Sequence, residues 1–66
     1  MNDFETKALQ VAQRITGQAG DFYNGTLFLE CDASNAALVE SALIQALHCG
    51  VVVSKATHTE FSFDFV

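Results

Sequence analysis

The chain has 66 residues, half of them hydrophobic and seven of them aromatic. This composition is too apolar for a disordered chain, and the length is sufficient for one domain, residues 1–66, without a deep pocket. Three basic residues stand against eight acidic ones, for a formal net charge of -5. Direct binding to nucleic acid or to an anionic membrane surface is therefore not expected, because both need clustered cations.

Residues 3–16 place apolar side chains at helical spacing and predict a first amphipathic helix. Asn2 and Glu5 fit a capping box at its start, and Gly17 fits its end. The start and stop signals agree on one helix.

A turn-rich connection follows, and it contains the dipeptide Asn24-Gly25. This dipeptide is a strong hairpin signal, so a short extra strand near Phe22 is expected to pair with Thr26 to Phe28. Phe22 and Tyr23 are expected to pack on one end of the core, and projection toward a partner is the alternative.

The stretch from Thr26 to Val53 predicts a strand, a helix and a second strand. Thr26 to Cys31 alternates so that Leu27 and Leu29 share one face. Residues 34–48 are amphipathic and predict the helix, with Leu38 in its buried stripe and Gly50 as its left-handed C-cap. Residues 51–56 predict the second strand of this unit.

Residues 59–66 alternate with a period of two, so Phe61, Phe63 and Phe65 point one way. We predict an α+β two-layer sandwich of order α-β-α-β-β, with the possible extra strand near Phe22. The sheet is expected to be mixed, with three to four strands and both helices on one face. The last strand is expected to lie between the two parallel ones, because an exposed apolar edge invites aggregation. An edge position is the alternative.

The sheet face turned away from the helices is the predicted interaction surface. Alternation assigns to it carboxylates interleaved with apolar groups. The predicted partner-binding residues are Glu30, Glu60, Asp64, Phe28 and Val52. The other residues assigned to this face are Thr26, Ser54, Ser62 and Val66.

The alternative candidate is a catalytic site formed by Cys31 and His58. They are expected at one pole of the sheet, near a helix N-terminus, where a thiol and an imidazole could form a small thiol enzyme. Cys49 and His48 are expected at the opposite pole, about 22 Å away along the helix. We therefore predict two free thiols, no metal site and no cofactor.

The preferred functional prediction is a non-enzymatic protein-binding module. In its small size, its acidity and its lack of catalytic motifs, the chain resembles the inhibitors that phages make against host defence systems such as CRISPR effectors. That resemblance implies a viral anti-defence or anti-CRISPR inhibitor acting in the host cytoplasm on a basic, nucleic-acid-handling protein. A homodimeric structural protein, pairing through its open sheet face or a strand edge, is the second hypothesis. The acidic N-terminal sequence does not resemble a signal peptide, so a cytoplasmic protein is expected.

Overall fold

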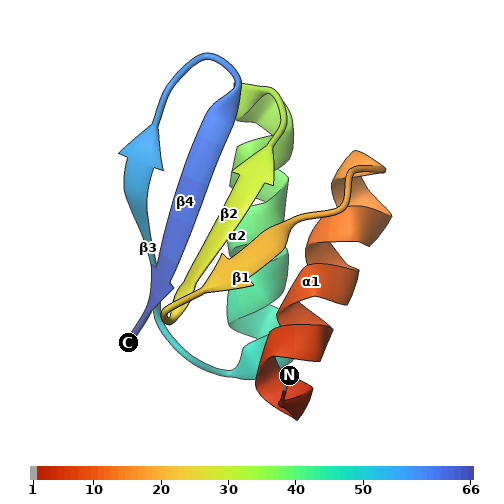
Figure 1. The fold of residues 1–66 in the computed structure, drawn as a ribbon, viewed down its shortest axis with the longest axis vertical. Coiled ribbons are helices and arrows are strands. Elements are labelled where there is room, and N and C mark those ends of the chain that lie inside the picture. The colour runs from red at the N-terminus through yellow and green to blue at the C-terminus, as the bar shows by residue number, and fades with distance from the viewer. Residues whose placement is uncertain (1) are drawn as a thin grey trace.

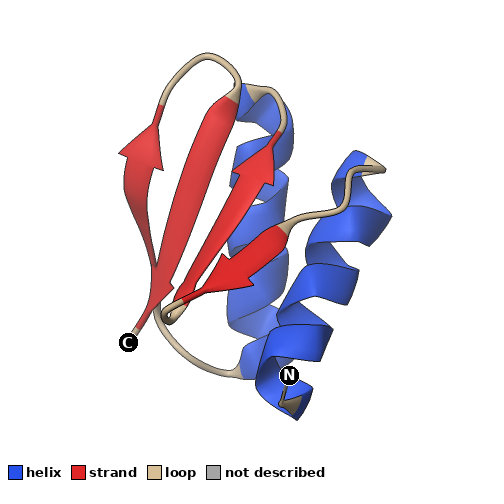
Figure 2. Ribbon diagram, in the orientation of Figure 1, coloured by secondary structure: helices blue, strands red, loops and turns tan. Residues whose placement is uncertain are grey.

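The protein folds into two layers, a sheet of four strands and a pair of helices that cover one face of it (Figures 1 and 2). The computed structural model describes residues 2–66. The predicted two-layer α+β architecture is confirmed, and the extra strand near Phe22 is present. The elements are α1 (Asp3–Thr16), β1 (Asp21–Tyr23), β2 (Thr26–Glu30), α2 (Ala33–Leu47), β3 (Val51–Ala56) and β4 (Glu60–Phe65).

The strand order is β1-β2-β4-β3. The last strand therefore lies in the interior of the sheet, between β2 and β3, as predicted. The prediction of a mixed sheet was wrong for the hydrogen-bonded pairs, because β1–β2, β2–β4 and β3–β4 are all antiparallel. β2 and β3 do run parallel to each other, but β4 separates them.

Both helices begin at capping side chains. The Asn2 side chain accepts a hydrogen bond from the backbone N–H of Glu5 at 2.8 Å, and Asp32 accepts one from that of Asn35 at 2.9 Å. Each bond satisfies one of the N–H groups that a helix start leaves without a partner. α1 ends as predicted at Gly17, which has a φ of 74°.

The prediction that Gly50 is the C-cap of α2 was wrong. His48 takes the left-handed conformation there, with a φ of 55° and a backbone N–H that donates to the Ile44 carbonyl. Gly50 instead pairs with Val66 through two backbone hydrogen bonds. A Cβ at Gly50 would lie 2.5 Å from Cγ2 of Val66, so the small residue allows the two strand ends to approach.

The core lies between the sheet and the helices. Its largest fully buried side chains come from both layers and are Phe63, Leu27, Leu43 and Val39. Leu38 was predicted in the buried stripe of α2, but 58% of it is exposed. Val39 and Leu43 are fully buried, and Leu38 lies about 100° round the helix from Val39 and about 140° from Leu43.

An aromatic cluster joins the start of α1 to the end of the sheet. Phe4 meets the rings of Phe22 and Phe65 edge to face, and those two rings stack with centroids 5.7 Å apart. Phe22 therefore packs, as predicted for the pair. Tyr23 does not follow it, because 73% of its surface is exposed. The cluster leaves Tyr23 to project beside the Asn24-Gly25 turn.

Candidate functional site: the open sheet face

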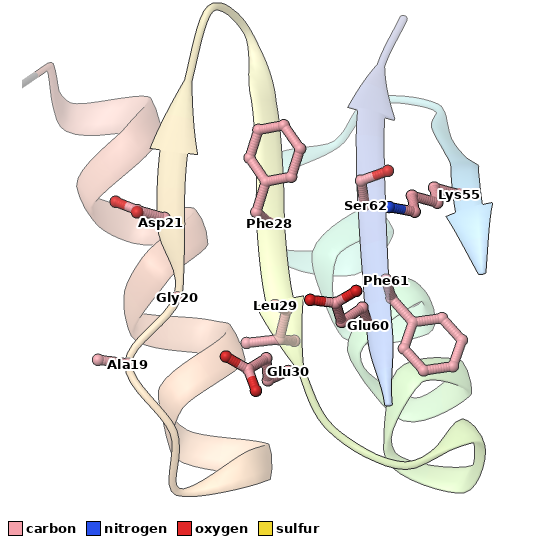
Figure 3. Close-up of a pocket in the computed structure, with 10 residues that line it drawn as sticks. All are labelled: Ala19, Gly20, Asp21, Phe28, Leu29, Glu30, Lys55, Glu60, Phe61 and Ser62. Carbon is pink, nitrogen blue, oxygen red and sulfur yellow. The ribbon is translucent and has the colours of Figure 1, made fainter. Parts of the chain in front are cut away.

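The sheet face turned away from the helices, called here the open face, carries every residue of the predicted interaction surface. Along β2, Leu27 and Leu29 are buried against the helical layer, whereas Phe28 and Glu30 are exposed. Figure 3 shows the side chains of Phe28, Glu30 and Glu60 together on this face, from two neighbouring strands. The alternation in the sequence therefore predicts the exposed side of the sheet correctly.

Strand register groups these side chains into rows across the sheet. Phe28 is the partner of Asp21 on one side and of Ser62 on the other, and Ser62 is in turn the partner of Lys55. A second row joins Thr26 to Asp64 and Asp64 to Val52. A third row consists of Glu30 and Glu60, which are direct partners. The five predicted binding residues thus occupy three adjacent rows.

The Glu30–Glu60 pair places two exposed carboxylates opposite each other on adjacent antiparallel strands. Side chains in such positions have Cβ atoms about 4.5–5.5 Å apart, and like charges there destabilise a sheet. A cation bound from outside would remove the repulsion. This row is the most electronegative part of the open face.

Asp64 is held differently from the two glutamates. Its Oδ1 accepts a hydrogen bond from the Thr26 hydroxyl at 2.6 Å, and the residue is half-buried. A charge-assisted hydrogen bond of this length fixes the carboxylate in one orientation. Asp64 therefore presents a positioned oxygen, whereas Glu30 and Glu60 lie in the exposed row.

A β-bulge brings Lys55 onto the open face. Val53 is the partner of Phe63, but Lys55 rather than Ser54 is the next partner, opposite Ser62. Strict alternation along the strand would turn Lys55 toward the helices, and the extra residue of the bulge reverses that direction. Lys55 is the single Lys or Arg on the strands that the structure describes, because Lys7 and Arg14 belong to α1.

Ser62 lies at the centre of the open face and is nevertheless buried, with 4% of its surface exposed. Its hydroxyl is 2.8 Å from that of Ser54, so the buried polar group is satisfied. Its register partners Phe28 and Lys55 flank it on the two neighbouring strands. The face therefore has a packed centre rather than an open one.

A shallow hollow of about 380 Å³ spans the first and third rows (Figure 3). Two of its charged lining residues, Asp21 and Lys55, were not among the predicted binding residues. Asp21 could have been found, since a two-residue Asn-Gly turn sets the register that places it opposite Phe28. Lys55 could not, because its direction depends on the bulge.

Large apolar side chains accompany the charges. Phe28 is 43% exposed and Val52 50% exposed on the open face. Tyr23 belongs to the same row as Thr26 and Asp64. Aromatic residues are enriched at the centres of protein interfaces, and polar groups surround them at the rim.

The alternative thiol site is assembled in part. The backbone N–H of Cys31 donates to the Thr59 carbonyl at 2.9 Å, so the turn containing His58 does lie at the predicted pole. Burial and the neighbouring Asp32 carboxylate both raise the pKa of the Cys31 thiol. These effects oppose formation of a thiolate, which is the reverse of what an activated cysteine needs. Cys31 and Cys49 are both free cysteines.

Within residues 2–66, no group of three or more His, Cys, Asp or Glu side chains is arranged to hold a metal ion. No helix in that range combines the length and the apolar character needed to cross a bilayer. Comparisons with protein-family models, with curated proteins and with solved structures give no match for this chain. The functional argument therefore starts from the open face itself.

Proposed function

We propose that this protein is a small non-enzymatic binding module that attaches the open face of its sheet to a basic protein. The observation that carries the proposal is the pairing of Glu30 with Glu60 across β2 and β4, in the row next to the exposed ring of Phe28. A partner that inserts a cation there gains two carboxylate contacts and relieves their repulsion. The fold itself has no need of such an arrangement.

The chemistry of the face selects the class of partner. Asp21, Glu30, Glu60 and Asp64 supply four carboxylates, against the single cation of Lys55. Complementary potentials accelerate encounter and suppress wrong partners, so a positively charged surface is favoured. Proteins that handle nucleic acids carry such surfaces. The proposed role is to inhibit or regulate a protein of this class, as the phage-encoded inhibitors of CRISPR effectors do.

Phe28 and Val52 supply the apolar part of the contact. Both are more than two-fifths exposed and lie on neighbouring rows of the face. An aromatic anchor surrounded by charges allows a partner to bury apolar area while the carboxylates set its orientation. A purely electrostatic complex would not need either residue.

The test compares three tagged proteins in an extract of the native host. The first is the wild type, the second carries Glu30→Lys, Glu60→Lys and Asp64→Lys, and the third carries Asp3→Lys, Glu40→Lys and Asp32→Asn, which alter acids off the open face. Circular dichroism verifies the fold of each. Mass spectrometry is expected to identify a basic nucleic-acid-handling protein with the first and third proteins and to find it absent with the second.

The same capture is repeated with increasing salt. Because exposed charges are screened by salt, recovery of the partner should fall as the ionic strength rises. Addition of the purified module should then inhibit the activity of the identified partner. Equal capture by the triple charge reversal would reject the open face as the binding surface.

A further inference from the structure

The outer edge of β3 is the longest unpaired strand edge of the sheet. β3 and β1 are the two terminal strands, and β1 has only three residues. Edges of this kind offer free N–H and C=O groups to another strand, and proteins normally protect them. We propose that the edge of β3 pairs antiparallel with the same edge of a second copy of this chain.

The hydrogen-bond pattern identifies the free groups. Gly50 and Val66 exchange two backbone hydrogen bonds, N–H to carbonyl in both directions, at 3.2 and 3.0 Å. Hydrogen-bonded pairs alternate with non-bonded pairs along an antiparallel ladder, so the next bonded pair is Val52 with Asp64. The backbone groups of Val51 and Val53 therefore point away from β4, toward the outside of the sheet.

The bulge limits this edge to a short regular segment. It interrupts the ladder between Val53 and Lys55, so Val51 to Val53 is the regular part of the free edge. An antiparallel pairing of two copies centred on Val52 joins Val51 of each chain to Val53 of the other. All four N–H groups and all four carbonyls of the two pairs are then used, and the contact closes as a two-fold dimer.

One exposed apolar side chain lies at the centre of this regular segment. Val52 lies on the open face and is 50% exposed.

The charge distribution favours a second copy as the occupant. Residues 49–57 contain no carboxylate and one cation, Lys55, although the chain has eight acids. Two copies can therefore join these edges without bringing their acidic rows together. The dimer brings the two Val52 residues together at its centre and leaves the two open faces continuous across eight strands.

Proline at position 53 tests the pairing without breaking the sheet. The Val53 N–H points outward, so Val53→Pro removes no bond between β3 and β4, and proline is tolerated at such edge positions. The control, Val53→Ala, loses the same side-chain packing but keeps the N–H. Sedimentation equilibrium of the protein alone should show a monomer–dimer equilibrium for the wild type and the control, and an association constant at least about tenfold lower for Val53→Pro.

A second measurement applies even where the proline variant fails to fold. In the centred pairing, Val52 faces its own counterpart in a non-bonded pair with Cα atoms about 4.5 Å apart, within the range of a disulfide. With Cys31 and Cys49 changed to Ser, Val52→Cys should form a covalent dimer under mild oxidation. Glu60→Cys, on the interior strand β4, should not do so at a comparable rate.

The proposal is overturned by a wild type that remains monomeric at every concentration. It is also overturned by equal dimerisation of Val53→Pro and Val53→Ala, or by equal cross-linking of Val52→Cys and Glu60→Cys. Because no partner protein is present in these experiments, their outcome is independent of capture through the open face.

Discussion

The two faces of this sheet are built from alternate residues of the same strands, and they follow different rules. On the face toward the helices, Leu27 and Phe63 are register partners and both are fully buried. On the open face, Phe28, the next residue along β2, is exposed, and Glu30 faces Glu60. The inner face maximises burial, whereas the open face keeps an aromatic ring and a like-charge pair in solvent.

The difference separates what stabilises the fold from what is available for binding. A sequence that specifies one structure normally satisfies local rules everywhere, and departures from them are typical of functional sites. The open face contains two such departures in adjacent rows. Substitutions on the inner face should therefore lower stability more than binding, and substitutions on the open face should lower binding more than stability.

The largest effect is expected for Phe63→Ala. Truncating a fully buried phenylalanine costs about 3–5 kcal/mol, which is a large share of the stability of a domain this small. Phe28→Ala is the matched control on the other face, and its cost should be about 1 kcal/mol or less because the ring is already partly in water. Chemical denaturation followed by circular dichroism measures both. Equal losses for the two variants would contradict the division between the faces.

Much of this division can be predicted from sequence because it depends on periodicity. The alternation in β2 and β4 places Phe61 and Phe63 inside and Glu30 outside, as the structure has them. Local signals succeed where a short segment decides the conformation, as at the Asn24-Gly25 turn, whose residues have φ values of 55° and 83°. The helix start at Asn2 is of the same kind.

The features that sequence reasoning missed depend on tertiary contacts. The bulge that turns Lys55 outward leaves no local signal, because serine and lysine fit a regular strand equally well. His48 ends α2, and Gly50 instead lies against Val66, sixteen positions later in the chain, where a Cβ would meet the Val66 side chain. The burial of Ser62 likewise depends on neighbours from two other strands.

A smaller effect is expected for Thr26→Val, which removes the hydroxyl that donates to Asp64. The two side chains have the same shape, so packing is preserved and the half-buried carboxylate loses one partner. The free energy of unfolding should fall by about 0.5–1.5 kcal/mol. The control is Thr26→Val in an Asp64→Asn background, where the loss should be smaller because the acceptor is no longer charged. An identical loss in both backgrounds would show that the charge on Asp64 adds nothing to the hydrogen bond.

The smallest effect has the opposite sign. Glu60→Gln removes one charge of the exposed like-charge pair, so it should stabilise the fold by a few tenths of a kcal/mol, up to about 1 kcal/mol, at low salt. Salt should diminish the gain, and Glu60→Gln in a Glu30→Gln background should show almost none. Capture of the basic partner should weaken in the same variant that gains stability. If Glu60 contributes to the stability of the fold, its substitution should destabilise the protein. A Glu60→Gln variant that is more stable and binds the partner more weakly would show that this carboxylate serves binding. A less stable variant would show that it serves the fold.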